Sequence, residues 1–472
     1  MAKRWCAAAA AAVALLLPAG TSTASATQDV VLTMDDGVPV AATLHLPDGT
    51  APAGGWPAIV FLHGLAGNRQ DMNALARAYG FVGERYVVLT FDARGHGQSG
   101  GLVSIDGPRE VADTRTVFEW LRDRPDVADG KIGAWGISYG GGAIWNSLVA
   151  GVPWAAVEVV ETWTDLNQAL APQGLVKSGL VAALSGSIPD ARKSPSLQAI
   201  QAAAFAGTDQ DGVAAWARER SSLDRLGTVR TPVFLMQGRR DFLFGVDQAT
   251  RAFAKLKGPK RLWLGNHGHA PSSFPAADTG AMLREGLRWF DRFLRGEQNG
   301  ADRQPPIVLA RGEKAATVPY ASLPPTRTST VALAGARAAS IRPGGKVVRR
   351  FATASEVELF GTPTVTVRAT AGGGWSRLVA VLTARPRGGQ DIVVAAGGVP
   401  TLPGPRTYRI GLSSQATYVP AGSRWTLTLA SSSTVQSSGN LLYLELPMPA
   451  GARISVGPAS LRLPRLARPV SG

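Results

Sequence analysis

The sequence predicts an α/β domain followed by an all-β domain, and two observations support this division. Up to about residue 294, short apolar runs alternate with segments of helical periodicity, which is the pattern of a parallel sheet with right-handed helical crossovers. Beyond residue 306 the helical periodicity ends, and short strand-like runs are separated by Gly, Pro and Ser, as in a β-sandwich. The polar segment 297–306 contains Gly and Pro and is predicted to be a linker.

The predicted α/β domain covers residues 27–296. It opens with a hairpin in which Val30–Met34 and Val38–Leu46 flank a turn at Asp35-Asp36-Gly37. The later strands are nearly continuous in apolar character, as expected for strands that are covered on both faces. These predicted strands are Ala58–Leu62, Tyr86–Phe91, Lys131–Ile137, Ala155–Val160, Pro232–Gln237 and Arg261–Gly265.

A cap and a second domain complete the predicted architecture. Residues 166–226 contain helical and loop segments with no clear strand, which indicates a helical cap inserted over the sheet. The last helix, 276–294, carries an apolar stripe at helical spacing that is predicted to pack in the core. The predicted sandwich covers residues 307–472, and its strands are Glu356–Phe360, Thr364–Ala369, Ser376–Thr383, Arg406–Leu412, Arg424–Leu429 and Leu441–Leu446.

Residues 1–26 have the pattern of a secretory signal peptide. Lys3 and Arg4 precede an apolar stretch that is too short to span a membrane, and Ala24-Ser25-Ala26 is a typical cleavage site. We therefore expect cleavage near Ala26 and a secreted, extracellular protein. Cys6 is the only cysteine and lies in this segment, so the mature chain is expected to lack disulfides, Cys-ligated zinc and a thiol nucleophile.

The formal net charge of +15 comes from arginines and lysines scattered along the chain. Because no long basic run or interleaved aromatic motif is present, we expect no nucleic-acid partner, and no later segment is apolar enough for a membrane span. Weak adhesion to an anionic cell envelope is the alternative that the charge leaves open. The expected partner is a small-molecule ester or peptide substrate.

A nucleophile motif supports a more specific fold. The run Gly136-Ile137-Ser138-Tyr139-Gly140 matches G-x-S-x-G between a predicted strand and a predicted helix, as in the nucleophile elbow of an α/β-hydrolase. Gly97-Gln98-Ser99-Gly100-Gly101 matches the same pattern, but it follows a Gly-rich turn and precedes no clear helix. Ser138 is therefore the predicted nucleophile.

A serine nucleophile needs an imidazole to accept its proton and a carboxylate to orient that imidazole. In α/β-hydrolases these partners follow in the order Ser, Asp, His, and only His267 and His269 come after Ser138. We favour His269 because it lies further into the loop after the last strand, and His267 is left as a substrate-pocket or supporting residue. Asp241 follows the preceding strand and is the predicted acid, with Asp247 as the alternative.

Two backbone N–H groups are the expected donors to the oxyanion of the reaction. One belongs to Tyr139, directly after the nucleophile, and the other to Leu65, in the turn His63-Gly64-Leu65-Ala66-Gly67. His63 is expected to shape this turn. We expect no cofactor and no metal, since His267-Gly268-His269 without a defined carboxylate ligand is a weak zinc signal.

These motifs together resemble the secreted α/β-hydrolases grouped with X-prolyl dipeptidyl-peptidases and cocaine-esterase-like acyl esterases. The resemblance implies an α/β-hydrolase fold with a helical cap insertion, followed by a C-terminal all-β jelly-roll-like sandwich. The chain departs from this group at Leu65, where relatives often have an aromatic residue, and at His267, where a tryptophan is common. The matching stretches are Asp36–Val40, Asp92–Gly101, Asp113–Leu121, Ile137–Gly141, Trp289–Gly296, Val357–Pro363 and Leu461–Pro464.

Three functions are weighed on this basis. The first is an acyl esterase that forms an acyl-enzyme on Ser138. The second is an X-Pro dipeptidyl-peptidase, which needs a carboxylate for the substrate ammonium, and Glu161 and Asp165 just past a strand are the candidates. The third is a non-catalytic envelope-binding protein on a hydrolase scaffold, with Trp375 and Trp425 of the sandwich as its aromatic residues.

Overall fold

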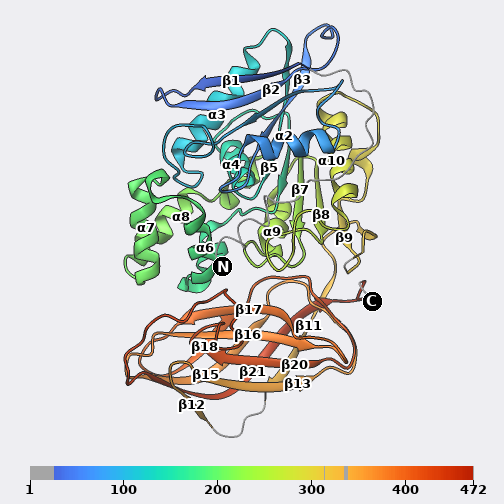
Figure 1. The fold of residues 1–472 in the computed structure, drawn as a ribbon. Helices are drawn as coiled ribbons and strands as arrows, with labels where there is room; N and C mark the ends of the chain where they lie inside the picture. Colours follow the sequence, from blue (N-terminus) through green and yellow to red (C-terminus); the bar gives the residue numbers. More distant parts are fainter. Residues whose placement is uncertain (1–25, 313, 334–337, 471–472) are drawn as a thin grey trace.

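The computed structural model describes residues 26–312, 314–333 and 338–470, and it contains an α/β domain stacked on a β-sandwich (Figure 1). The predicted signal peptide lies outside these residues, apart from Ala26. No helix within the described ranges is both long and apolar enough to cross a membrane.

The α/β domain is built on a ten-stranded sheet with the order β1-β2-β4-β3-β5-β6-β7-β8-β9-β10. The neighbours from β4 to β9 are parallel, whereas β1, β2 and β10 are attached antiparallel at the two ends. Every strand predicted for this domain is present. The bounds are β1 Thr27–Thr33, β2 Pro39–His45, β3 Trp56–Leu62, β4 Val87–Phe91, β5 Val127–Ile137, β6 Ala156–Val160, β7 Val233–Gly238, β8 Lys260–Gly265, β9 Ile307–Ala310 and β10 Thr317–Tyr320.

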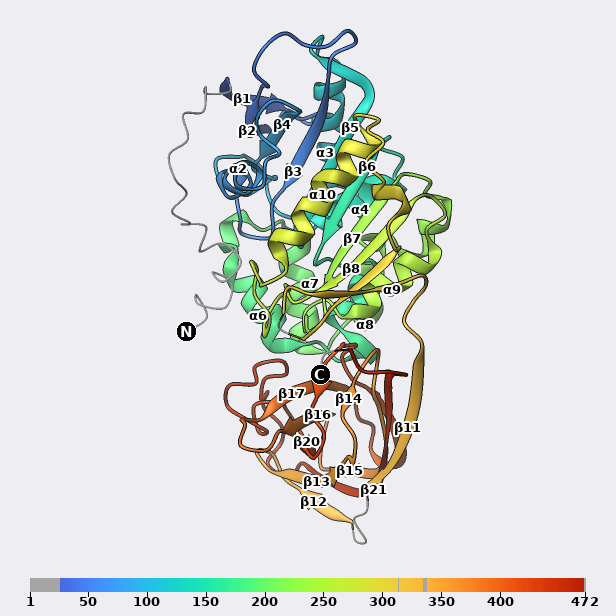
Figure 2. The same cartoon turned by 90° about the vertical axis from the view of Figure 1, so that its right-hand side faces the viewer.

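Helices cover both faces of this sheet, so the central strands are buried on both sides, as their continuous apolar runs predict. Met72 of α2 and Trp289 of α10 share one core with Phe61 of β3, whereas Ile144 of α4 and Phe253 of α9 belong to the core on the opposite face. Figure 2 shows α2 and α10 on the near side of the sheet. The helices are α2 Arg69–Ala78, α3 Pro108–Arg122, α4 Tyr139–Val149, α9 Val246–Lys255 and α10 Thr279–Phe293.

The cap lies where the sequence predicts it, between β6 and β7. It consists of helices joined by loops, and α6, α7 and α8 lie above the sandwich at the left of Figure 1. Its elements are α5 Leu166–Leu170, η2 Pro172–Gly174, α6 Ser178–Ser187, η3 Asp190–Arg192, α7 Pro195–Ala206, α8 Gln210–Glu219 and η4 Leu223–Thr228.

The predicted boundary between the two domains is wrong. Residues 307–320 were assigned to the sandwich, but β9 pairs with β8 and β10 pairs with β9, so both extend the sheet of the α/β domain. The segment 297–306 is also more than a linker, because it folds back on α10. There, Asn299 donates to the carbonyl of Arg288 at 2.8 Å, and the Arg288 guanidinium donates to the carbonyl of Asn299 at 2.7 Å.

The sandwich begins at β11 and has two main antiparallel sheets around one apolar core, together with a short antiparallel pair formed by β14 and β19. One sheet has the order β11-β21-β15-β18, with β12 also paired to β21, and the other has the order β13-β20-β16-β17. The bounds are β11 Thr326–Leu333, β12 Ala339–Ile341, β13 Lys346–Ala352, β14 Val357–Glu358, β15 Thr364–Gly372, β16 Arg377–Arg385, β17 Ile392–Pro400, β18 Gly404–Gly411, β19 Tyr418–Val419, β20 Arg424–Ala430 and β21 Arg453–Leu466.

The predicted strand Leu441–Leu446 is not a strand. Its apolar side chains are buried between the domains instead, because Leu442 and Tyr443 pack against Phe242 of the α/β domain. Its backbone also meets the cap, since the Leu444 N–H donates to the Ser178 hydroxyl at 2.9 Å. An apolar run at a domain interface has the same composition as a strand in a core, so the pattern alone does not separate the two.

Candidate active site

Ser138 occupies the sharp turn between β5 and α4, with φ 55° and ψ −113°. A positive φ is strained for a residue with a side chain. The turn also requires small neighbours, since a Cβ on Gly140 would lie 2.2 Å from the Leu62 carbonyl oxygen and one on Gly136 would lie 2.5 Å from the Gly140 carbonyl oxygen. The predicted strand–turn–helix context of the motif is therefore present.

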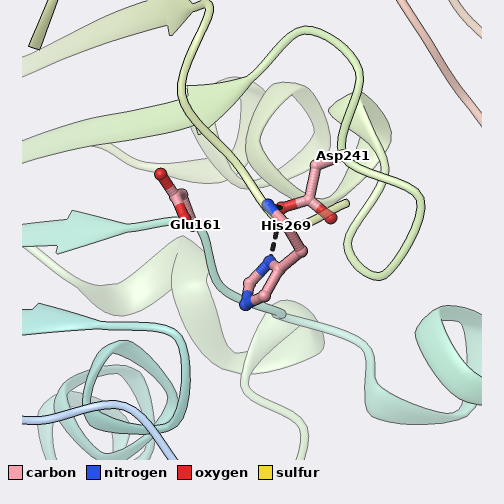
Figure 3. A group of neighbouring side chains, drawn as sticks. All are labelled: Glu161, Asp241 and His269. Carbon is pink, nitrogen blue, oxygen red and sulfur yellow. Dashed lines mark hydrogen bonds and ion pairs between the residues drawn. The ribbon is translucent and has the colours of Figure 1, made fainter. Parts of the chain in front are cut away.

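Three predicted residues meet at this edge of the sheet. The Ser138 Oγ lies 3.0 Å from His269 Nε2. His269 Nδ1 lies 2.7 Å from Asp241 Oδ2, and Figure 3 shows this second contact. Ser138 follows β5, Asp241 follows β7 and His269 lies in the loop after β8. Because these strands are parallel and close together in the sheet, their carboxyl ends bring the three side chains together.

Asp241 is fully buried, yet it is held as a carboxylate. Its Oδ1 accepts the N–H groups of Leu243 at 2.9 Å and Phe244 at 2.8 Å, and its Oδ2 accepts the backbone N–H of His269 at 3.2 Å. Burial raises the pKa of Asp241, but the charge and hydrogen bond of His269 and these backbone donors outweigh it and lower the pKa below the usual value. The aspartate can therefore orient the imidazole and stabilise its positive charge.

His269 is placed to accept a proton from Ser138. Its side chain is 20% exposed, and its ring packs edge-on against Phe244 with the centroids 5.1 Å apart. Burial lowers the pKa of His269, but the charge and hydrogen bond of Asp241 and the charge of Glu161 outweigh it and raise the pKa above 6.5. Asp247, the alternative acid, lies in the first turn of α9 instead.

The loop of Asp241 is also held by the sandwich, which the sequence does not predict. Gln415 donates through Nε2 to the backbone carbonyl of Asp241 at 2.8 Å, and the Ala416 N–H donates to the Arg239 carbonyl at 2.8 Å. Arg239 in turn forms a buried ion pair with Glu358. These contacts join residues that are more than 100 positions apart in the sequence, so no local sequence pattern predicts them.

Leu65 and Tyr139, the predicted oxyanion donors, flank Ser138 in the wall of one cavity. The turn that carries Leu65 is shaped by His63, as predicted, because His63 Nε2 accepts the Ala93 N–H at 2.9 Å and Nδ1 donates to the Gly64 carbonyl at 2.7 Å. This turn passes close to the nucleophile, since a Cβ on Gly64 would lie 3.7 Å from the Ser138 Cβ.

Ser99, in the second G-x-S-x-G match, is structural. Its side chain is buried, and its hydroxyl donates to the Asp92 carbonyl at 2.6 Å and accepts the Ala41 N–H at 2.9 Å. Among the described residues no histidine ring is bonded to this hydroxyl, and the contact with His96 is a backbone hydrogen bond from the Ser99 N–H at 2.9 Å. Of the two serines, only Ser138 lies in a strand–turn–helix and is bonded to a histidine ring.

The three other predicted binding residues lie outside the walls of the cavity beside Ser138. Glu161 and His267 are buried and bonded to one another, with His267 Nδ1 donating to Glu161 Oε1 at 2.6 Å. Asp165 caps α5, where it accepts the Gln168 N–H at 3.1 Å, and it lies 3.4 Å from Arg251. The structure therefore brings Glu161 and His267 next to the Ser138–His269–Asp241 group but leaves Asp165 away from it.

The cavity has a volume of about 110 Å³ and lies between Ser138 and the cap. Its walls are mainly apolar, and its polar lining is Ser138, Asn167, Ser185, Lys193 and Gln201. Lys193 is already paired, because its Nζ lies 2.7 Å from Asp190 Oδ1 and 3.0 Å from Ser185 Oγ. No Asp or Glu is found among the described residues that line this cavity. The apolar walls include Leu170, Val181, Leu184, Ile188, Ile200 and Trp216.

Side-chain oxygen and nitrogen atoms of Glu161, Asp241 and His269 lie within 4.8 Å of one another. Two of the three residues, Asp241 and His269, share a hydrogen bond, and His269 is also bonded to the Ser138 hydroxyl. A second acidic group, Asp35, Asp36 and Asp113, forms ion pairs with Arg94 and Arg109.

Known proteins with similar sequences and folds match this architecture. A protein from Streptomyces avermitilis with the name "Putative Xaa-Pro dipeptidyl-peptidase" is 27% identical over 257 residues, which are 49% of this chain and 37% of that protein. Cocaine esterase of Rhodococcus sp. (strain MB1 Bresler) is 24% identical over 350 residues, or 60% of this chain and 58% of the esterase. The chain thus spans less than two thirds of the length of either relative.

The fold is that of a solved CocE/NonD family hydrolase from Staphylococcus aureus. The two structures superpose with a TM-score of 0.72 at 16% identity, covering 93% of this chain and 94% of the other. The family model described as X-Pro dipeptidyl-peptidase (S15 family) matches residues 36–271, which is half of the chain and includes Ser138, Asp241 and His269. The chain therefore belongs to the X-Pro dipeptidyl-peptidase (S15) family.

Proposed function

We propose that this protein is a serine hydrolase that cleaves esters of apolar acyl groups through an acyl-enzyme. The observation that carries the proposal is the continuous hydrogen-bonded series from Ser138 Oγ through His269 to Asp241, at 3.0 Å and 2.7 Å. A nucleophile, a base and an orienting carboxylate in this geometry are the parts that acyl transfer requires. Secretion after cleavage near Ala26 is part of the same proposal and rests on the sequence pattern of residues 1–26 alone.

The reaction proceeds in two halves. Ser138 Oγ attacks the ester carbonyl carbon while His269 Nε2 accepts the hydroxyl proton, and the resulting oxyanion accepts hydrogen bonds from the backbone N–H groups of Tyr139 and Leu65. The tetrahedral intermediate collapses, the carbon–oxygen bond breaks, and protonated His269 gives its proton to the leaving alkoxide. A water molecule then attacks the acyl carbon while His269 accepts its proton. The bond from this carbon to Ser138 Oγ breaks, protonated His269 returns the proton to Ser138, and the carboxylic acid is released.

The cavity favours an ester over an X-Pro peptide. A dipeptidyl-peptidase must hold the free ammonium of its substrate, and burying a cation without an anionic partner is costly. No carboxylate lines the described part of the cavity, and Glu161 is bonded to His267 instead of facing the cavity. An uncharged aliphatic or aromatic acyl group fits these walls better.

The X-Pro dipeptidyl-peptidase remains the second candidate because the family model carries that description. The third, an envelope-binding protein without catalysis, has less support. Trp375 and Trp425 are both buried, at 3% and 0% exposure, so neither presents a ring to a ligand on the sandwich surface.

A substrate comparison tests the proposal. The purified protein and its Ser138→Ala variant would be assayed on p-nitrophenyl acetate, butyrate and hexanoate and on Ala-Pro-p-nitroanilide. We expect Ser138-dependent ester turnover, higher kcat/KM for the longer acyl chains and little anilide cleavage. Anilide cleavage that requires a free amino terminus would favour the peptidase, and ester turnover that persists in Ser138→Ala would exclude Ser138 as the nucleophile.

A further inference from the structure

Glu161 is held in a strained position at the end of β6. Glu161 has a φ of +49° and is only 3% exposed, and backbone hydrogen bonds hold it on both sides. The Glu161 N–H donates to the Met236 carbonyl of β7 at 2.8 Å, and the preceding Val160 carbonyl accepts the Ser138 N–H at 2.8 Å. Strain of this kind persists only where the surroundings impose it, and such residues concentrate at functional sites.

The Glu161 carboxylate lies between two histidines. One oxygen accepts a hydrogen bond from His267 Nδ1 at 2.6 Å, and the carboxylate also lies within 4.8 Å of the polar atoms of Asp241 and His269. Figure 3 shows Glu161 and Asp241 approaching His269 from two separate strand ends. His269 therefore has a carboxylate on each of two sides, of which only Asp241 forms a hydrogen bond with it.

A buried carboxylate is stable only with compensating positive charge or hydrogen bonds. His267 supplies one hydrogen bond to Glu161. A second positive charge arises within 4.8 Å of the Glu161 carboxylate when His269 accepts the proton of Ser138 during the reaction. The Glu161 charge thus interacts more favourably with the transition state than with the resting enzyme, which is the condition for a contribution to rate.

We propose that Glu161 is a positioning residue of this site, a second carboxylate that stabilises protonated His269 beside Asp241 and is itself held by His267. This role rests on the proposed function, because it needs His269 to act as the base of Ser138. It differs from binding of a substrate ammonium, since Glu161 does not line the cavity.

The other charged groups around this cluster already have partners. Asp278, just before α10, accepts the Trp263 indole N–H at 2.8 Å and the Asn266 N–H at 3.1 Å. Lys177 of the cap donates to the carbonyls of Phe242 at 2.8 Å and Leu243 at 3.1 Å, and burial lowers its pKa to about 8. Lys177 therefore titrates above neutral pH. It does not determine the acid limb of the pH profile, which is the pH range over which kcat/KM falls as the solution becomes more acidic.

The test is the pH dependence of kcat/KM for a p-nitrophenyl ester in Glu161→Gln. Loss of the negative charge makes His269 easier to deprotonate, so we expect the acid limb to move down by about one pH unit. We also expect kcat on the plateau to fall by up to about tenfold, because a weaker base accepts the serine proton less readily. A merely structural role would lower activity without moving the limb.

Glu158→Gln is the matched control, because Glu158 is a buried carboxyl on the same strand three residues earlier. Its carboxyl lies against Gly286 of α10, and burial raises the pKa of Glu158 well above its usual value, so its replacement removes a buried carboxyl that makes none of the contacts of Glu161. We expect the acid limb of this variant to stay at the wild-type position. Movement of the limb in Glu158→Gln equal to that in Glu161→Gln would overturn the proposal.

Glu161→Asp is the second variant and covers the case in which Glu161→Gln does not fold. It keeps the charge but withdraws it by one methylene, so we expect a smaller shift in the same direction. An unmoved limb in whichever of the two variants folds overturns the role of Glu161 while the serine-hydrolase proposal stands. Absence of Ser138-dependent turnover in the wild type would instead reject the proposed function.

Discussion

Two histidine–carboxylate pairs lie side by side at the carboxyl ends of β6, β7 and β8. They differ in the partner of the second imidazole nitrogen and in exposure to solvent. The Asp241–His269 pair ends on the Ser138 hydroxyl, and the His269 side chain is 20% exposed. The Glu161–His267 pair is buried, and His267 Nε2 has no hydrogen-bond partner among the described residues. Each pair joins a histidine to a carboxylate, but only His269 places its second imidazole nitrogen at the hydroxyl of Ser138.

The sharpest test of this difference is replacement of each histidine. We expect His269→Ala to lower kcat/KM on a p-nitrophenyl ester by on the order of 10⁴-fold or more, because Ser138 loses its base. We expect His267→Asn to lower it by about tenfold or less, since His267 acts only through Glu161. Equal losses in two folded variants would contradict the distinction between the pairs.

Replacement of the two carboxylates gives the next largest contrast. Asp241→Asn is expected to reduce kcat by about 10³- to 10⁴-fold, because the amide no longer selects the tautomer of His269 or stabilises its charge. This loss far exceeds the one expected for Glu161→Gln. Steady-state kinetics would measure the loss of kcat in each variant, with far-UV circular dichroism as a check of folding. A smaller loss in Asp241→Asn than in Glu161→Gln would indicate that Glu161 is the main carboxylate partner of His269.

The pH profile of the wild type sharpens the assignment of the base. His269 must be neutral to accept the serine proton, so kcat/KM rises as the pH increases through its pKa. Because Asp241 and Glu161 outweigh burial and raise that pKa, we expect the midpoint of the acid limb to lie above 6.5. A midpoint below 6.5 would show that the two carboxylates do not dominate the environment of His269.

The smallest expected effect concerns the hydrogen bond from the sandwich to the acid loop, which is the loop after β7 that carries Asp241. Gln415→Ala removes the 2.8 Å hydrogen bond to the Asp241 carbonyl. A hydrogen bond of this kind contributes about 1 kcal/mol. If the transition state loses all of this stabilisation, kcat is expected to fall about fivefold. Gln390→Ala, at an exposed position of the same domain, is the control. Unchanged kcat in Gln415→Ala would show that the loop keeps its geometry without the sandwich.

Much of the α/β domain could be predicted from the sequence because its strands are short, apolar throughout and buried on both faces. The sandwich was harder, since its half-exposed strands give a weaker pattern. The longest strand, β21, contains Gly457, Pro458 and Pro464 and is absent from the predicted strands, whereas the apolar run Leu441–Leu446, which is predicted as a strand, lies at the domain interface.

The arrangement of Ser138, Asp241 and His269 agrees with the prediction because chain order and position after a strand are local properties. Their catalytic roles stay a prediction until the variants are measured. The partners of Glu161 and the contact from Gln415 could not be predicted in the same way, because each depends on how distant segments pack. Glu161 and His267 were both named from the sequence, but their hydrogen bond to one another was not.

The interface between the domains limits which domain exchanges the protein can tolerate during evolution. The sandwich supplies Gln415 to the acid loop, and its segment near Leu444 is bonded to the cap at Ser178. Exchange of the sandwich for that of a relative would therefore exchange a hydrogen-bond donor of the acid loop and a support of the cap at once. We therefore expect recombination at the domain boundary to be tolerated only between chains whose interface residues match.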